Sequence, residues 1–189
     1  MTGTDAPARS LVGPGGGCYN QPVSATQHKA HGPTSVRVFL VTVSDTRTEE
    51  TDTSGKLAME LLRAAGHTLA GYRVLKDEPA EVAALIRGVA SDGVADVLIT
   101  SGGTGVSRRD STYEAVAGLL DKRLDGFGEL FRMLSYQEIG SAAMMSRAVG
   151  GLCGGLAVFA LPGSSAAVRL GLEKLILPEL GHIVFEKGR

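Results

Sequence analysis

The feature that most constrains this chain is a short apolar segment followed at once by a cluster of glycines. The apolar run Val97–Ile99 ends close to Ser101. Such a run is typical of a strand that is covered on both faces of a parallel sheet. Gly102, Gly103 and Gly105 come directly after it. Because glycine accepts positive φ and carries no side chain, a ligand can approach the main-chain amides of this loop.

A helix is predicted to begin just beyond the glycines. Ser111 and Glu114 have the spacing of a capping box, and Thr112 is an alternative N-cap. A loop between a strand and a helix N-terminus binds anions, because unpaired N–H groups and the helix dipole both face the ligand. Arg108 and Arg109 add positive charge. The local pattern therefore predicts a phosphorylated ligand.

Two acidic residues follow the ends of predicted strands. Asp110 comes after the glycine loop, and Asp77 comes after the strand predicted over Thr68–Leu75. In a parallel sheet these strand ends lie at one edge, so the two carboxylates could share a divalent cation and a polyphosphate. The alternative is that each aspartate only caps a helix and that the glycines form only a tight turn.

The loop does not match the common nucleotide-binding signatures. The Gly150–Gly155 spacing of a Walker loop is followed by Leu156 rather than lysine. The dinucleotide pattern G-x-G-x-x-G is also missing, because Arg108 stands where the third glycine would follow Gly103 and Gly105. The loop therefore predicts a phosphate group without identifying the ligand.

Strands alternate with amphipathic helices along the rest of the chain, which predicts a three-layer α/β/α sandwich with a mostly parallel central sheet. After a polar loop over Thr46–Ser54, helices are expected from Gly55 to Gly66, from Pro79 onward, and from about Phe127 to Ile139. The remaining strands are expected over Val36–Val43 and Leu156–Leu161, with Gly154-Gly155 turning the chain into the latter; a helix then runs to Pro178, and a short one ends at Phe185.

Residues 1–33 differ in composition from the rest of the chain. They are rich in Gly, Pro, Ser, Thr and Ala and carry few large apolar side chains, so we expect a flexible arm followed by an α/β domain over residues 34–189. His28 and His31 have a helical spacing, but without a third ligand they are expected to be solvated rather than metal-bound. Cys18 and Cys153 form no disulfide or metal motif.

Charge and hydropathy exclude several classes of protein. The formal net charge is −1, with both signs spread along the chain, so no broad nucleic-acid or membrane surface is indicated. No stretch resembles a signal peptide or a transmembrane span. A cytoplasmic protein is expected.

Several motifs, in fixed order, resemble those of one known family. The segment Thr100–Gly105 ending in Arg109-Asp110 is similar to the central motif of the MoaB/MogA family of molybdenum-cofactor proteins, which includes the G domain of gephyrin. The run Phe127–Gly140 resembles the MoaB branch. In place of the family's usual proline stands Tyr113, which should affect helix entry more than chemistry. The other matching motifs are Val43-Ser44-Asp45, Asp52-Thr-Ser-Gly55, Lys76-Asp77-Glu78, Gly126-Phe-Gly128, Ser146-Arg-Ala148 and Leu161-Pro-Gly-Ser164.

The resemblance implies a molybdopterin-binding domain that adenylylates molybdopterin with Mg-ATP, releasing pyrophosphate. It gives the catalytic and Mg²⁺-binding roles to Asp77 and Asp110. Substrate and nucleotide contacts are expected at Ser44, Asp45, Asp52, Thr100, Ser101, Gly102, Gly103, Thr104, Gly105, Arg108, Arg109, Ser146, Arg147, Pro162, Gly163 and Ser164.

Two alternatives to this activity stay open. One is a MoaB-branch protein that binds or carries molybdopterin without adenylating it, and the other is an unrelated enzyme with a phosphorylated ligand. The resemblance also implies a homotrimer or a hexamer made of two trimers. Molybdopterin and ATP are the expected small-molecule partners, with other molybdenum-cofactor proteins as further candidates.

Overall fold

A computed structural model describes residues 32–189 of the chain. Cys18, His28 and His31, and the predicted arm up to residue 31, lie outside the described residues. Gly32 packs closely against the backbone of Gly181, so the described part begins beside the C-terminal helix.

One six-stranded sheet forms the centre of the molecule, with the strand order β2-β1-β3-β6-β5-β4. The pairs β1–β2, β1–β3 and β3–β6 are parallel, and the pairs β5–β6 and β4–β5 are antiparallel. The predicted α/β fold with a mostly parallel sheet is therefore confirmed. The strands are β1 (Arg37–Val43), β2 (Thr68–Leu75), β3 (Val97–Ser101), β4 (Lys122–Arg123), β5 (Val149–Cys153) and β6 (Leu156–Leu161).

The antiparallel edge includes a strand that was not expected from the sequence. Strand β5 pairs with β6 through a turn at Gly154 and Gly155, whose φ angles are +54° and +83°. Strand β5 contains glycines, which are uncommon in strands, so its sequence did not predict a strand. The glycines are needed there for close packing. A Cβ at Gly150 would lie 2.6 Å from the ring of Phe159.

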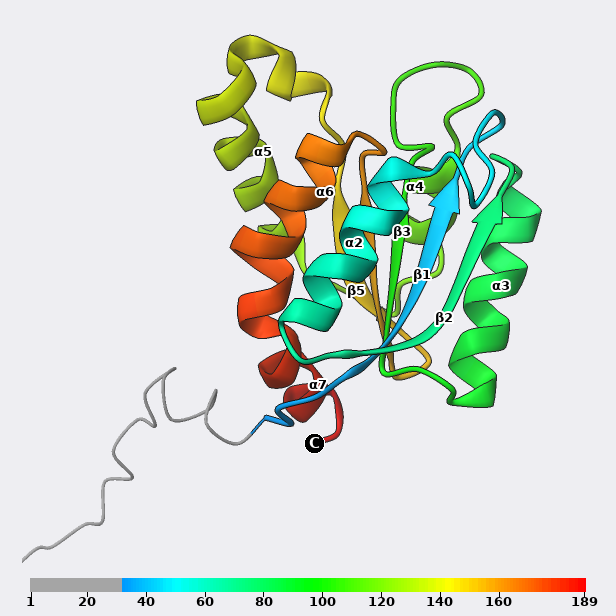
Figure 1. The fold of residues 1–189 in the computed structure, drawn as a ribbon, viewed down its shortest axis with the longest axis vertical. Helices are drawn as coiled ribbons and strands as arrows, with labels where there is room; N and C mark the ends of the chain where they lie inside the picture. Colours follow the sequence, from blue (N-terminus) through cyan, green and yellow to red (C-terminus); the bar gives the residue numbers. More distant parts are fainter. Residues whose placement is uncertain (1–31) are drawn as a thin grey trace, which may run out of the picture.

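Helices cover both faces of the sheet (Figure 1). Helices α2, α5, α6 and α7 lie on one face, and α3 and α4 lie on the other, as Figure 1 shows. Their bounds are α2 (Thr53–Ala64), α3 (Pro79–Asp92), α4 (Thr112–Ala117), α5 (Asp125–Ile139), the 3-10 turn η1 (Gly140–Met145), α6 (Ser165–Gly171), the π-helical turn η2 (Leu172–Ile176), the 3-10 turn η3 (Leu177–Glu179) and α7 (Leu180–Lys187).

Each face of the sheet has its own apolar cluster. Leu62 of α2, Phe131 of α5 and Val168 of α6 pack on one face. Ile86 of α3 and Val116 of α4 pack on the other. Since β1, β3 and β6 are buried on both faces, the loops at their carboxyl ends are held by a rigid core. None of the helices described over residues 32–189 is long and apolar enough to cross a membrane.

Candidate functional site

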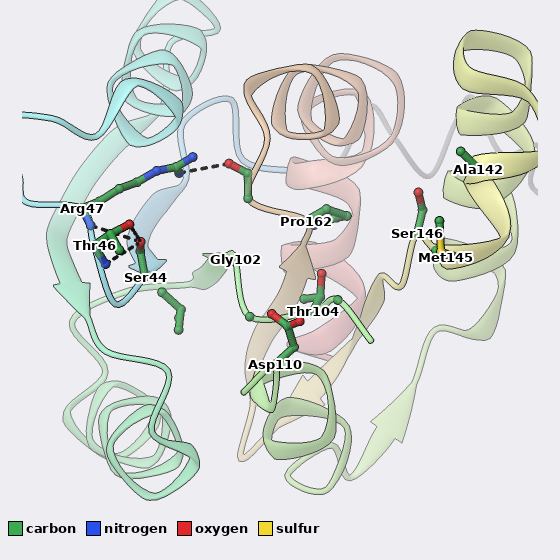
Figure 2. A pocket seen from close by; sticks show the side chains of 14 residues that line it. Ser44, Thr46, Arg47, Gly102, Thr104, Asp110, Ala142, Met145, Ser146 and Pro162 are labelled. Carbon is green, nitrogen blue, oxygen red and sulfur yellow. Dashed lines mark hydrogen bonds between the residues drawn. The ribbon is translucent and has the colours of Figure 1, made fainter. Parts of the chain in front are cut away.

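A pocket of about 420 Å³ opens at the carboxyl ends of β1, β3 and β6 (Figure 2). This is the edge at which parallel α/β sheets bind ligands. The η1 turn closes the side opposite β1, as the labelled Ala142 and Met145 in Figure 2 show. The lining residues are Val43, Ser44, Thr46, Arg47, Gly102, Gly103, Thr104, Gly105, Asp110, Ala142, Met145, Ser146, Pro162 and Gly163.

The glycine loop lines this pocket and contains free backbone amides. Among residues 32–189, the backbone N–H groups of Gly103, Thr104 and Gly105 donate no hydrogen bond. Gly102 is tied to β6 by its N–H, which donates to the carbonyl of Leu161 at 3.0 Å. Its φ of +106°, and the carbonyl of Val43 that a Cβ would strike, require glycine there. The loop is therefore built to receive an anion.

Asp77 and Asp110 lie against glycines two positions apart in this loop. A Cβ added at Gly105 would lie 2.6 Å from Oδ2 of Asp110, and one added at Gly103 would collide with Oδ2 of Asp77. Asp110 lines the pocket, and its Oδ2 accepts a hydrogen bond from the N–H of Ser107 at 3.0 Å. Within the described residues Oδ1 of Asp110 accepts none, so this oxygen is available to a ligand.

Asp77 has a second task at the start of α4. It is buried, and its Oδ1 accepts hydrogen bonds from the N–H and hydroxyl of Ser111 and from the hydroxyl of Thr112. The predicted capping box is therefore wrong: Ser111 makes no side-chain cap bond, because its hydroxyl turns to Asp77. Glu114, the other member of the box, pairs with Arg147 instead.

Arg147 holds the glycine loop from outside the pocket. Its Nε donates to the carbonyl of Thr104 at 2.8 Å and its Nη2 donates to the carbonyl of Gly105 at 2.5 Å. The ion pair with Glu114 and the ring of Tyr113 fix the guanidinium. Because Arg147 binds the carbonyl of Thr104, it orients the peptide group that carries the free N–H of Gly105.

Asp52 organises the opposite wall without reaching the pocket. It is completely buried and caps α2, accepting hydrogen bonds from the hydroxyls of Thr42 at 2.5 Å and Tyr72 at 2.6 Å. Burial opposes its ionisation, but the hydrogen bonds from Thr42, Tyr72, Gly55 and Ser54 together hold the pKa of Asp52 below its usual value. Burial, followed by the hydrogen bond to Asp52, raises the pKa of Tyr72.

Arg109 lies outside the pocket in an exposed ion-pair cluster. Its Nη2 lies 2.9 Å from Oδ2 of Asp45 and 3.4 Å from Oε1 of Glu78. The hydrogen bond from Arg109 is the main cause of the lowered pKa of Asp45, and the N–H of Asp77 also donates to that carboxylate. Arg108 is exposed and does not line the pocket either.

The structure brings about half of the expected contact residues to one pocket. Buried Thr100 and Ser101 belong to β3, and Ser164 caps α6 by accepting from the N–H of Ala167 at 3.2 Å. Five lining residues were not expected: Val43, Thr46, Arg47, Ala142 and Met145. Thr46 and Arg47 could have been predicted from the sequence, because they come just after the end of β1. No sequence pattern pointed to Ala142 or Met145.

Comparison with known proteins identifies the family. Residues 39–182 match the family model described as "Probable molybdopterin binding domain". The chain is 56% identical over 169 residues to molybdenum cofactor biosynthesis protein B of Bacillus cereus, covering 88% of this chain and 99% of the relative.

Two solved structures share the fold. A crystal structure of a molybdenum cofactor biosynthesis protein B has a TM-score of 0.81 at 56% identity, covering 83% of this chain and 98% of that one. The tungsten cofactor synthesizing protein MoaB from Pyrococcus furiosus has a TM-score of 0.74 at 38% identity, covering 83% and 99%. The chain therefore belongs to the MoaB branch of the MoaB/MogA family of molybdenum cofactor biosynthesis proteins.

Proposed function

We propose that this protein adenylylates molybdopterin, transferring AMP from Mg-ATP to the terminal phosphate of the pterin and releasing pyrophosphate. One observation supports the proposal most directly. The backbone amides of Gly103, Thr104 and Gly105 have no hydrogen-bond partner within residues 32–189, and these residues line the same pocket as Asp110, whose Oδ1 is also free. Amide donors bind phosphate oxygens, and a carboxylate beside them can bind the cation that neutralises the phosphates.

The chemistry requires alignment and charge neutralisation more than proton transfer. An oxygen of the pterin phosphate attacks the α-phosphorus of ATP, and the bond from that phosphorus to the oxygen bridging the β-phosphorus breaks. Because the attacking phosphate is already ionised at neutral pH, no histidine base is needed. The free amides of Gly103, Thr104 and Gly105 would bind oxygens of the reacting phosphates.

The donor set suits a magnesium ion that is shared with substrate. Within residues 32–189 no three His, Cys, Asp or Glu side chains are grouped to hold a metal by themselves. Mg²⁺ is commonly held by one or two carboxylates together with substrate phosphates, so Asp110 and Asp77 would hold it here. When bound, the ion would neutralise charge on the phosphates.

The test is formation of adenylyl-molybdopterin from molybdopterin and Mg-ATP. We expect Asp110→Asn and Asp77→Asn to lower turnover by orders of magnitude. Since Asp77 also holds the start of α4, the folded state of each variant is checked by thermal unfolding. Wild-type turnover in both variants would refute the proposed roles.

Calorimetry separates the enzyme from a carrier. An adenylyltransferase binds both molybdopterin and Mg-ATP, whereas a carrier binds the pterin and ignores ATP. If the wild-type protein binds molybdopterin, fails to bind Mg-ATP and forms no product, the carrier function replaces the proposed one. Binding of Mg-ATP without molybdopterin would point to a different phosphate-ligand enzyme.

We further propose that the chain assembles as a homotrimer or as a pair of trimers. The support is a set of exposed apolar side chains on α5, of which Leu130, Met133 and Ile139 are 47%, 51% and 53% exposed. Exposed apolar groups of this size, clustered on one helix, are typical of a subunit interface.

A further inference from the structure

We propose that Arg47 is the anion-binding side chain of the pocket and that, opposed by Asp110, it fixes the direction in which a phosphorylated substrate binds. This inference deepens the proposed function and rests on it for the identity of the substrate. In this arrangement an anionic group of the substrate binds beside Arg47, at the wall formed by the loops after β1 and β6. A cation or a hydrogen-bond donor binds on the opposite side, beside Asp110.

The distribution of charge in the pocket is the first observation. Among the lining residues only Arg47 and Asp110 are charged. They come from different loops, one after β1 and the other after β3, and Figure 2 shows them on different sides of the opening. A phosphate group is attracted by the guanidinium and repelled by the carboxylate. A bound anion is therefore expected at the Arg47 end of the pocket.

The backbone before the Arg47 side chain is fixed by a local turn. The hydroxyl oxygen of Ser44 accepts hydrogen bonds from the N–H of Thr46 at 3.3 Å and from the N–H of Arg47 at 3.2 Å. These bonds define the direction in which the side chain leaves the chain.

One nitrogen of the guanidinium is used for anchoring and the others are available. Nη1 donates to the hydroxyl of Ser54 at 2.6 Å and to the carbonyl of Gly163 at 3.0 Å, the latter drawn in Figure 2. Within residues 32–189 Nε and Nη2 donate to nothing, and the side chain is 32% exposed. A guanidinium that is anchored through Nη1 and keeps Nε and Nη2 free is well suited to bind phosphate oxygens.

The nearby Asp52 pairs only with the anchored nitrogen of this guanidinium. Nη1 of Arg47 donates a long hydrogen bond of 3.5 Å to Oδ1 of Asp52, and this ion pair involves neither Nε nor Nη2. The Asp52 carboxylate already accepts hydrogen bonds from Thr42, Ser54, Tyr72 and the N–H of Gly55. Arg109, by contrast, is bound by two carboxylates outside the pocket.

The test is calorimetric titration of the full chain with inorganic pyrophosphate in the presence of a chelator. We expect Arg47→Gln to weaken binding by at least about tenfold, as for loss of a charge-assisted hydrogen bond. Arg47→Lys should restore part of the affinity, because it keeps the charge. Asp110→Asn should strengthen binding, because it removes a repelling charge. Arg169→Gln is the matched control, since Arg169 pairs only with Glu173 on the surface in the described residues.

Three outcomes would overturn the inference. Equal affinities in wild type, Arg47→Gln and Arg169→Gln would show that Arg47 does not bind the anion. A Lys variant as weak as the Gln variant would assign Arg47 a purely structural role, and absence of binding in the wild type would remove the site. Because pyrophosphate binding needs no turnover, a protein that binds as expected but forms no adenylyl-molybdopterin refutes only the proposed function.

Discussion

The guanidinium of Arg147 lies over the ring of Tyr113, 4.7 Å from its centroid. Arg147 precedes β5, and Tyr113 is in the first turn of α4, so the contact joins the antiparallel edge of the sheet to the helix that follows the glycine loop. The same guanidinium donates to the carbonyls of Thr104 and Gly105. Tyr113 therefore supports the residue that orients the loop.

Replacing Arg147 with alanine should loosen both ends of the glycine loop. The N–H of Gly102 donates to Leu161, and the N–H of Thr112 donates to the carbonyl of Gly103. We expect these two amides to exchange with solvent about tenfold faster, because the loop loses two hydrogen bonds to a charged donor. Hydrogen exchange measures this directly.

The matched control for the loop is Arg123→Ala, which removes an exposed pair with Asp125. It should leave the exchange of Gly102 and Thr112 unchanged. If Arg147→Ala also leaves both amides at their wild-type rates, Arg147 does not hold the loop.

Replacing Asp52 with alanine should destabilise the fold strongly. The change removes the α2 cap and leaves the hydroxyls of Thr42 and Tyr72 without their acceptor in a buried site. We expect a loss of about 2–4 kcal/mol in the free energy of unfolding, measured by urea denaturation. Ser164→Ala removes the more exposed cap of α6 and should cost only about 1 kcal/mol. Equal losses in the two variants would contradict the special role of Asp52.

Stability should depend on pH through the pair between Asp96 and Arg37. The two nitrogens Nε and Nη2 of Arg37 donate to the carboxylate at 3.2 and 2.9 Å, and Arg37 lowers the pKa of Asp96. A carboxyl whose folded pKa is depressed stabilises the fold above its unfolded pKa of about 3.9, and this contribution is lost as the pH falls through the folded pKa.

The variant Asp96→Asn isolates this contribution. At pH 7 it should be less stable than the wild type by at most about 1 kcal/mol, since Arg37 is half exposed. The difference should shrink below about pH 4, because there the unfolded chain takes up the proton of Asp96 more readily than the folded protein does. Urea unfolding at a series of pH values measures both; a difference that does not change with pH would exclude ionisation of Asp96 as the cause.

Placing a charge among the exposed apolar side chains of α5 should change the oligomeric state. Met133 is 51% exposed, so Met133→Glu should not harm the core but should place charge in the proposed interface. We expect light scattering to give a trimer or hexamer for the wild type and a smaller species for the variant. Lys56→Glu on α2, on an exposed residue, controls for surface charge. A monomeric wild type would refute the assembly.

The sequence alone determined the parallel part of the sheet and the glycine loop. The apolar runs Val97–Ile99 and Leu156–Leu161 are typical of buried strands, and their ends carry the loops that line the pocket. These features are local, because hydrophobic period and glycine conformation are set within a few residues. For the same reason the motifs were enough to indicate the family.

Only the tertiary structure decided what the charged side chains contact. Arg147 holds carbonyls 42 and 43 residues away, and Arg47 reaches Gly163 across 116 residues. Glu114 was expected in a capping box but pairs with Arg147, which lies close enough to bind it. Arg109 was expected in the pocket but pairs with Asp45 outside it. A long charged side chain has several possible partners of similar energy, and the packed core determines which of them is close enough to bind.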